Sequence, residues 1–404
     1  MKLKNIHTLI ISAVLLAGCA KSTAPVAEFK QWNAVPTGLL AEQPFANEPL
    51  SKEQCSEAAE IVDSLWLASS AQRLAKQWKK LTIANDSIKL ACAVRTFGLP
   101  PADGRSLYIS MHGGGECPKE VNDEQWMNQI YLYEPAEGVY IAPRAPWNTS
   151  DLWHRKGLDE LLEEVIEACV VFEGVNPNKV YLLGYSAGGD GVWRVAPRMA
   201  DKWAAASMMA GHPGDASQLN LMNLPFMIWM GEHDHYYDRN KLAMEKAQLM
   251  DSLQAANPGL YTHSNNIIKD KGHWMERIDT AAISWMAQYR RNPYPKKVMW
   301  RQELVTRSHF YWLAAPAEEL QQGKTIAASI TGNTIDIQQC DYSRLTIYLN
   351  DSLVDLDNEV TVRYKGKRVA CVKPKRTIAN MHRNLFERGD RSYAFPAIIE
   401  VKLK

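Results

Sequence analysis

The sequence has almost no excess of charge of either sign, since 46 lysine and arginine residues stand against 45 aspartate and glutamate residues. Proteins that bind nucleic acids usually carry a strongly basic surface, so this balance argues against nucleic acid as a partner. The chain also lacks a Cys-x-x-Cys pair and a His-Glu-x-x-His motif, two common signatures of zinc sites. No internal repeat is evident, and the composition is that of an ordinary globular protein.

Long apolar runs are scarce as well. The clearest one begins the chain, where two lysines precede an apolar stretch over residues 9–17 that is too short to span a bilayer. This pattern predicts a signal peptide over residues 1–18, and Leu16-Ala17-Gly18-Cys19 resembles the lipobox of bacterial lipoproteins. On that resemblance Cys19 carries a lipid anchor, and Ala20 after it implies the outer membrane. An ordinary signal peptide with a chance cysteine is the alternative.

The rest of the chain divides by composition. Residues 19–50 are rich in small and polar residues with little periodicity, which predicts a flexible tether. After an apolar helical pattern over residues 51–80, short apolar runs alternate with helical patterns, as in a parallel sheet that is buried on both faces. We therefore expect an α/β domain over residues 51–291, with strands at 106–112, 138–143, 179–185, 204–211 and 225–231 and helices at 158–172, 189–199, 239–253 and 274–290.

A second domain follows a boundary marked by prolines and basic residues at 290–297. Over residues 298–404 apolar and polar residues alternate, with turn signals between the segments, which predicts a small antiparallel β domain of the sandwich type. Aromatic residues within 300–313 could form a carbohydrate platform, but packing between the domains is the favoured reading.

The cysteines suggest disulfides, because an even number is left in an exported chain once Cys19 is set aside. Sequence does not choose among the pairings. We expect only Cys340 to pair with Cys371, because both lie in the C-terminal domain, and buried free thiols are the alternative. The six are Cys55, Cys92, Cys117, Cys169, Cys340 and Cys371.

The segment Gly184-Tyr185-Ser186-Ala187-Gly188 fits the pattern Gly-x-Ser-x-Gly. It lies between an expected buried strand and an expected helix, which is the context of a nucleophile elbow. The glycines allow a sharp turn that exposes the hydroxyl beside the N-terminus of the helix. This predicts Ser186 as a nucleophile.

A glycine run, His112-Gly113-Gly114-Gly115-Glu116, directly follows an earlier expected strand. Backbone N–H groups in such a loop can approach a developing negative oxygen, because no side chain intervenes. We assign one oxyanion donor to Gly114, with Gly115 as a weaker choice, and the other to the amide of Ala187. A plain glycine turn is the alternative.

An acid and a histidine follow the serine in the order Ser, Asp, His. Asp234 comes after the strand at 225–231, and His273 lies in a later loop. His273 would take the proton of the serine, and Asp234 would hold its imidazole in the required tautomer. Asp238 is the rival acid, and Asp270 and Glu232 are weaker ones.

A metal site is the alternative reading of the segment around Asp234, since His233, His235 and Asp238 lie close by in sequence. Neighbouring side chains at a strand end point to opposite faces, so we expect no convergence and predict neither a metal nor a cofactor. Trp147 and Trp153, in a loop after another strand, are predicted to line the substrate pocket, with simple packing as the alternative.

Together the segments HGGGE, GYSAGGDGVWRVAPRMADKWAAASMMAGHP, GEHDHYYDRN and KGHWME resemble the α/β-hydrolase superfamily, over about residues 80–291. They look closest to its bacterial dienelactone-hydrolase-like and polyhydroxybutyrate-depolymerase-like serine esterase branches. The resemblance implies a mostly parallel sheet flanked by helices and a Ser-Asp-His triad. Dienelactone hydrolases proper use cysteine, so lactone opening is not implied.

The resemblance also implies an activity. We expect a carboxylic ester hydrolase that acts through an acyl-enzyme without a cofactor, on a small-molecule or polymer-borne ester, held to a membrane through Cys19. A serine peptidase of the prolyl-oligopeptidase type is the alternative within this fold. A non-catalytic surface-binding lipoprotein on a hydrolase scaffold is the alternative from another class.

Overall fold

The structure is a computed structural model, and it describes residues 24–35 and 38–403. The predicted signal peptide over residues 1–18 and the predicted lipidation at Cys19 lie outside these residues. Among the helices that are described, none is both long enough and apolar enough to cross a membrane.

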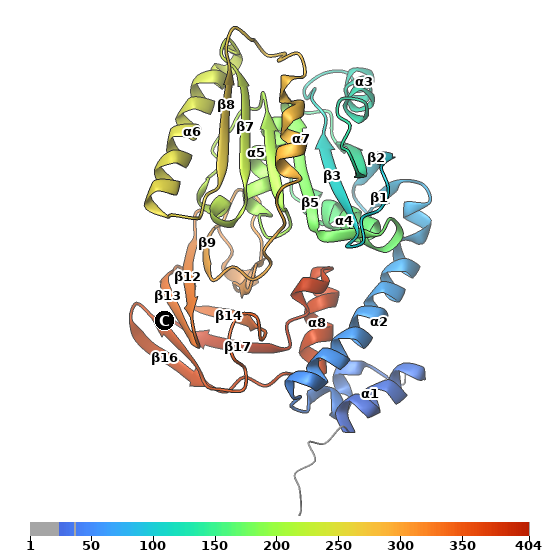
Figure 1. Ribbon diagram of the computed structural model, residues 1–404, viewed down its shortest axis with the longest axis vertical. Helices are drawn as coiled ribbons and strands as arrows, with labels where there is room; N and C mark the ends of the chain where they lie inside the picture. Colours follow the sequence, from blue (N-terminus) through green and yellow to red (C-terminus); the bar gives the residue numbers. More distant parts are fainter. Residues whose placement is uncertain (1–23, 36–37, 404) are drawn as a thin grey trace, which may run out of the picture.

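An eight-stranded sheet forms the centre of the upper part of the molecule in Figure 1. Its strand order is β1-β2-β4-β3-β5-β6-β7-β8. The neighbours from β4 to β8 in this order run parallel to one another. At the other edge, β1 pairs with β2 and β2 pairs with β4 in antiparallel fashion. The α/β prediction is confirmed. The strands are β1 (Thr82–Ala84), β2 (Lys89–Phe97), β3 (Arg105–Met111), β4 (Gly138–Arg144), β5 (Val175–Tyr185), β6 (Ala205–Met209), β7 (Phe226–Gly231) and β8 (His263–Ile268).

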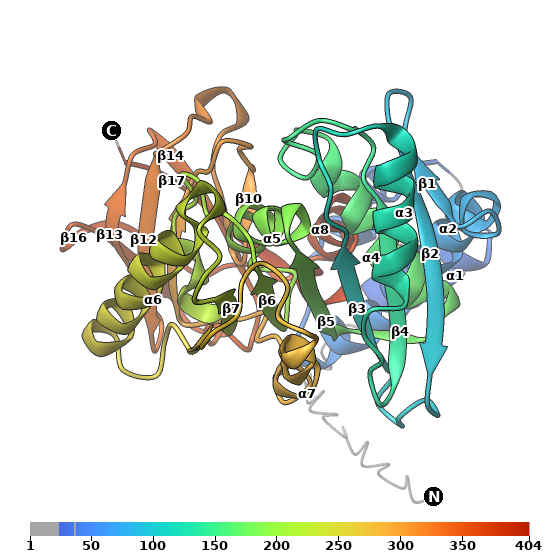
Figure 2. The same ribbon diagram turned by 90° about the horizontal axis from the view of Figure 1, so that it is seen from above.

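Helices cover both faces of this sheet, and Figure 2 shows α5 and α6 on one side of β5 to β7 with α7 on the other. Side chains alternate along β3: Ile109 joins the core beneath α4, α5 and α6, whereas Tyr108 joins the core beneath α3 and α7. The helix α7 is shorter than the predicted helix over 274–290, because Glu276 and Arg277 have positive φ angles. The helices are α3 (Lys119–Ile130), α4 (Leu158–Phe172), α5 (Ala187–Arg198), α6 (Arg239–Ala256) and α7 (Ala281–Met286).

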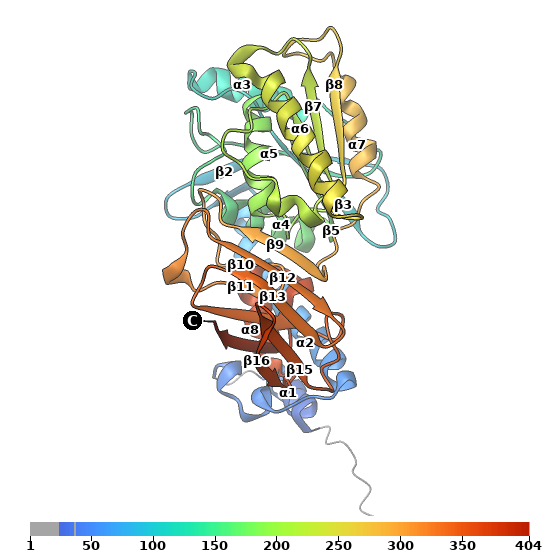
Figure 3. The ribbon, with the colours of Figure 1, turned by 90° about the vertical axis from the view of Figure 1, so that its left-hand side faces the viewer.

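Two smaller sheets lie below the large one in Figure 3, in the orders β10-β11-β14-β17 and β16-β15-β13-β12-β9. Ile326 and Ile337 of one sheet share a buried core with Ile347 of the other, as in a sandwich. The pairing is antiparallel as predicted except between β13 and β15, which run parallel. The strands are β9 (Lys297–Arg301), β10 (His309–Phe310), β11 (Leu313–Ala314), β12 (Thr325–Thr331), β13 (Thr334–Cys340), β14 (Arg344–Leu349), β15 (Val360–Tyr364), β16 (Lys367–Val372) and β17 (Ala397–Lys402).

The described part of residues 19–50 differs from the predicted tether. Residues Ala24–Ala34 form a helix, α1, and two short 3₁₀ turns follow at Leu40–Glu42 and Pro44–Asn47. Val26 and Phe29 of α1 are buried in a core shared with α2 (Lys52–Trp78) and α8 (Ile378–Arg388). A few well-placed apolar residues thus hold a segment whose composition resembles that of a linker.

The predicted disulfide between Cys340 and Cys371 is wrong, and all six cysteines among the described residues are free thiols. Cys371 lies in β16 and pairs with Thr361 of the neighbouring strand β15. Thr361 in turn pairs with Thr334 at the start of β13, whereas Cys340 lies at the end of β13. One intervening strand alone separates two chains by about 10 Å. A disulfide needs Cα atoms within about 7 Å, so the strand order forbids this bond.

A buried ion pair ties the C-terminal domain to the large sheet. Arg291 Nη1 lies 2.5 Å from Asp390 Oδ2, and the two side chains are only 2% and 6% exposed. The same guanidinium donates to Asn178 Oδ1, just before the core of β5, and to the carbonyl oxygen of Asp201. Arg291 therefore links three segments that are far apart in sequence.

Replacing Arg291 with methionine is expected to lower the free energy of unfolding by about 3–5 kcal/mol, since the carboxylate of Asp390 stays buried without its partner. Urea unfolding followed by circular dichroism measures this loss. Arg290→Met is the matched control, because Arg290 is 58% exposed in its pair with Asp103. The double variant Arg291→Met/Asp390→Leu should recover much of the stability, and equal losses for Arg290→Met and Arg291→Met would contradict the argument.

Candidate active site

Ser186 lies at the sharp turn between β5, which ends at Tyr185, and α5, which begins at Ala187. Its φ of 57° and ψ of −123° are unusual for a residue with a side chain. The turn needs its glycines, because a Cβ at Gly184 would lie 2.4 Å from the carbonyl oxygen of Gly188. A Cβ at Gly188 would lie 2.0 Å from that of Met111. Close packing against β3 therefore holds the strained conformation.

Three predicted residues form one hydrogen-bonded chain. The His273 Nε2 atom lies 2.9 Å from Ser186 Oγ, and His273 Nδ1 lies 2.7 Å from Asp234 Oδ2. In the tautomer that this chain requires, Nδ1–H donates to the carboxylate and Nε2 accepts from the hydroxyl. The Asp234 side chain is 1% exposed, whereas that of His273 is 43% exposed. The geometry orients the imidazole from its buried side and leaves its reactive side open.

Hydrogen bonds to the backbone hold the two loops that carry Asp234 and His273. The N–H of Asp234 donates to the carbonyl oxygen of Gly231 at the end of β7. Behind His273, the Tyr185 hydroxyl donates to the His273 carbonyl oxygen at 2.6 Å and accepts from the Met275 N–H at 3.2 Å. Burial raises the pKa of Tyr185, so the phenol stays protonated and able to donate. Sequence reasoning did not single out Tyr185, although it lies within the elbow motif itself.

The rival acids lie elsewhere. Asp238 is exposed and pairs with Lys241 at 2.8 Å, and the hydrogen bond from this lysine lowers the pKa of its carboxyl. Asp270 and Glu232 are also exposed and hydrogen-bond to each other, through the Asp270 N–H and Glu232 Oε2 at 3.0 Å. Among the four candidate acids, it is Asp234 that contacts the imidazole.

The glycine loop lies against the elbow. A Cβ at Gly113 would be 3.1 Å from the Cβ of Ser186, a tight contact, so glycine favours this close approach of the loop. Gly115 is not a free donor, because its N–H bonds Asn122 Oδ1 at 2.9 Å. Gly114 lines the same cavity as Ser186, and the N–H of Ala187 is the first of α5, where no helical carbonyl can accept it. Gly114 and Ala187 thus stay the candidate oxyanion donors.

Buried polar side chains hold this loop from behind. His112 Nδ1 donates to the Gly113 carbonyl oxygen at 2.6 Å, and its Nε2 accepts from the Ala145 N–H at 3.0 Å. Burial lowers the pKa of His112 to about 4, so the ring is neutral as these bonds require. Asn122 donates to the carbonyl oxygens of Gly115 and Cys117.

Asn122→Ala is expected to lower kcat for an ester substrate about 100-fold with little change in KM, because the freed loop no longer aims its N–H groups. Gln125→Ala is the matched control, since Gln125 lies on the same helix and lines the cavity but makes no hydrogen bond to the loop. Steady-state kinetics of both variants test this. A similar fall in kcat for both, or a change confined to KM, would rule out a positioning role for Asn122.

Ser186 and His273 open onto a cavity of about 630 Å³ whose lining includes Val121, Gln125 and Asn128 of α3, together with Trp274, which is 51% exposed. The predicted pocket tryptophans lie outside this lining. Trp153 is fully buried and donates to the His112 carbonyl oxygen at 3.0 Å, so it supports the glycine loop from within the core. Trp147 packs on the core and lies beneath the guanidinium of Arg155.

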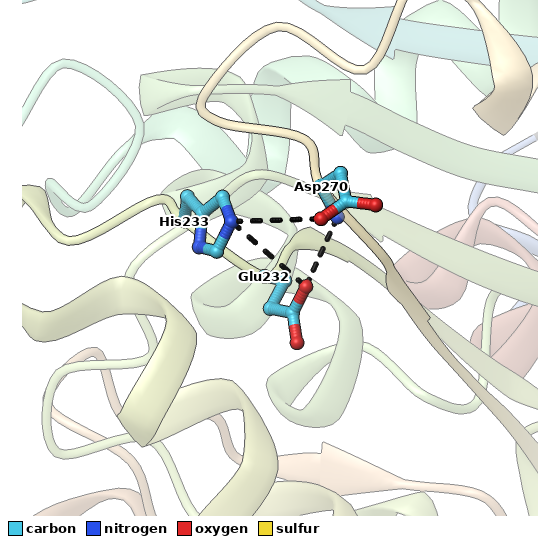
Figure 4. Close-up of side chains that lie close together, drawn as sticks. All are labelled: Glu232, His233 and Asp270. Atoms are coloured by element: carbon cyan, nitrogen blue, oxygen red, sulfur yellow. Dashed lines mark hydrogen bonds and ion pairs between the residues drawn. The ribbon is translucent and has the colours of Figure 1, made fainter.

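Of the residues weighed as a metal site, His233, Asp234 and His235 line one cavity, whereas Asp238 bonds Lys241 at the surface. A different group does gather, Glu232, His233 and Asp270, with candidate ligand atoms within 4.8 Å of one another (Figure 4). All three side chains are exposed, and His233 Nε2 lies 4.0 Å from each carboxylate. Because all three side chains are exposed, this group is an open surface cluster.

Comparison with known proteins gives distant matches. No family model and no curated protein matches the sequence. Among solved structures, a thermostable esterase is 16% identical with a TM-score of 0.42, and the match covers 52% of this chain but only 62% of that one. An S-formylglutathione hydrolase of Staphylococcus aureus is 14% identical, with a TM-score of 0.34 over 51% of this chain and 97% of that one.

Dipeptidyl peptidase 4 of Porphyromonas gingivalis is 13% identical, with a TM-score of 0.37 over 52% of this chain and 35% of that one.

The fold is assigned from the arrangement of the described residues. They form a mostly parallel eight-stranded sheet with helices on both faces, and a serine lies at the strand-to-helix turn after β5. This arrangement is an α/β-hydrolase fold, with an added C-terminal β sandwich.

Proposed function

We propose that the protein is a serine hydrolase in which Ser186 is the nucleophile, His273 the general base and acid, and Asp234 the residue that orients His273. The hydrogen-bonded chain from Ser186 through His273 to the buried Asp234 carries this proposal. Backbone strain concentrates at functional sites, and nucleophilic catalysis by a serine requires a base within hydrogen-bond reach of its hydroxyl, as His273 is here.

The reaction follows from these positions. As the Ser186 oxygen attacks the carbonyl carbon, its proton passes to His273 Nε2 and the carbonyl oxygen becomes an oxyanion facing the N–H groups of Gly114 and Ala187. The tetrahedral intermediate collapses, the bond to the leaving group breaks and His273 protonates that group. A water then attacks the acyl-enzyme and gives its proton to His273, which returns a proton to Ser186 as the acid product leaves.

Within this class we propose a carboxylic ester as the substrate. The motifs HGGGE and GYSAGGDG resemble those of serine esterases, and the cavity of about 630 Å³ beside Ser186 is large enough for a small ester group. We also propose that the mature protein is an outer-membrane lipoprotein anchored through Cys19. Loss of the protein from the membrane fraction in a Cys19→Ala variant would support the anchor, and unchanged fractionation would refute it.

A fluorophosphonate probe tests the catalytic proposal, because it labels activated serines covalently. We expect mass spectrometry to find the label on Ser186 and the protein to hydrolyse short p-nitrophenyl esters. Failure of both would refute the hydrolase. Labelling with cleavage of aminoacyl amides only would support the peptidase over the esterase, and loss of activity with a chelator would contradict a metal-free mechanism.

A further inference from the structure

Arg239 is a buried arginine beside the proposed catalytic residues. It is only 9% exposed and lies at the start of α6. It lines a second cavity, of about 410 Å³, together with Asp234, His273 and three neighbouring residues, His233, His235 and Tyr236. His273 also lines the larger cavity that contains Ser186, so the two cavities adjoin at the proposed general base.

The guanidinium of Arg239 lacks a strong partner. Among the described residues no carboxylate lies at ion-pair distance from it, and its Nε makes no hydrogen bond although that atom is buried. Its Nη1 donates only a long bond, of 3.4 Å, to the Tyr236 carbonyl oxygen, and its Cζ lies 5.0 Å from the ring centre of Tyr237. Burying a charge without a counter-charge is costly, so an arginine kept in this way calls for an explanation.

None of the neighbouring carboxyl groups that the structure describes bonds the guanidinium directly. Asp190 Oδ1 already accepts the His212 N–H at 2.6 Å, and burial raises the pKa of Asp190 in spite of the nearby charge of Arg239. Asp234 is bonded to His273. Asp238, the residue just before Arg239, points its carboxylate to Lys241.

The position on the helix adds a second cost. The N-terminus of a helix carries a partial positive charge and favours acidic side chains, yet the first turn of α6 contains no acidic residue and begins with Arg239. The first two N–H groups of this turn already have acceptors, since Arg239 N–H donates to the Tyr236 carbonyl oxygen and Asn240 N–H to that of Asp234. One anionic group in this cavity would offset both the buried charge of Arg239 and the unfavourable helix position.

We propose that the guanidinium of Arg239, at the start of α6, forms a subsite for an anionic oxygen group, a carboxylate or a phosphate, carried by the substrate. The inference rests on the proposed hydrolase function, because the two cavities meet at His273, the proposed general base. It narrows the substrate class to esters of acidic compounds, in which the anionic group lies a short distance from the scissile ester.

Two pairs of test esters place the charge on either side of the bond. The first pair is p-nitrophenyl hydrogen succinate and its neutral methyl ester, and the second is 4-acetoxybenzoate and its neutral methyl ester. We expect the wild type to favour the anionic member of at least one pair about 10- to 100-fold in kcat/KM, the effect of charge-assisted hydrogen bonds. Arg239→Gln should abolish this preference, and Arg239→Lys should restore part of it.

Lys241→Gln is the matched control, because it removes the same charge from the same turn of α6 at an exposed side chain. It should keep the preference. Binding of succinate and of inorganic phosphate to Ser186→Ala, measured by calorimetry, distinguishes the two anions. If the wild type cleaves the neutral esters but shows no preference in either pair, the inference is wrong and the hydrolase function stands.

The opposite outcome separates the two proposals as well. If no ester is cleaved, yet succinate or phosphate binds the wild type and not Arg239→Gln, the anion site stands and the hydrolase function falls. Should Arg239→Gln fail to fold, the preference of the wild type between the paired esters still decides the question. If Lys241→Gln and Arg239→Gln lost the preference for the anionic esters equally, the preference would come from the overall positive charge near α6, and the subsite proposal would be wrong.

Discussion

Replacing Ser186 with alanine is expected to lower kcat for a short p-nitrophenyl ester about a million-fold, the largest effect that we predict for any single change in this protein. Without Oγ no acyl-enzyme forms, and His273 has no hydroxyl to activate. The N–H groups of Gly114 and Ala187 would still face a bound carbonyl, so a weak residual rate over water is expected. Steady-state assays at a high enzyme concentration, with the substrate still in excess, measure the loss together with fluorophosphonate labelling.

Ser207→Ala is the matched control, because Ser207 is a fully buried serine on the neighbouring strand β6 whose hydroxyl makes no hydrogen bond. Its activity should stay near that of the wild type. A fall of only a few fold for Ser186→Ala, with the label retained, would place the nucleophile elsewhere. Similar thermal stability of both variants is required, since a loss through unfolding would say nothing about chemistry.

The sequence alone predicted those strands whose residues are nearly all buried. The runs that became β3 to β7 are almost continuously buried, and they stand out as apolar. Strand β8, His263–Ile268, has no fully buried residue, and α3 has few apolar positions, so neither produced a signal. The helix α1 was missed for the same reason, because only three of its residues are buried, Pro25, Val26 and Phe29.

The site divides in a similar way. Ser186 and Asp234 were predicted because each follows a recognisable strand, and His273 because it comes after them in the order Ser, Asp, His. Asn122 and Arg239 depend on contacts between segments that no local pattern reports. The prediction for Trp153 was wrong because an aromatic residue in a loop is as ready to pack inward as to line a pocket.

Asp234→Asn is expected to lower kcat about 10,000-fold while the fold and the position of the ring are kept. The buried carboxylate accepts the Nδ1–H of His273 at 2.7 Å, which leaves Nε2 free to accept the serine proton. An asparagine amide in this place can donate to Nδ1, and the proton then sits on Nε2. In that tautomer the ring cannot act as the general base, so the loss should appear in kcat and in the rate of fluorophosphonate labelling alike.

Asp238→Asn is the control that makes this result specific. Asp238 lies four residues from Asp234 and carries the same charge, but its side chain is 64% exposed and bonded to Lys241. Removing it changes the local charge by the same amount without touching the imidazole, so kcat should change little. If Asp238→Asn lost activity as severely as Asp234→Asn, the effect would be electrostatic over a distance, and the tautomer argument for Asp234 would fail.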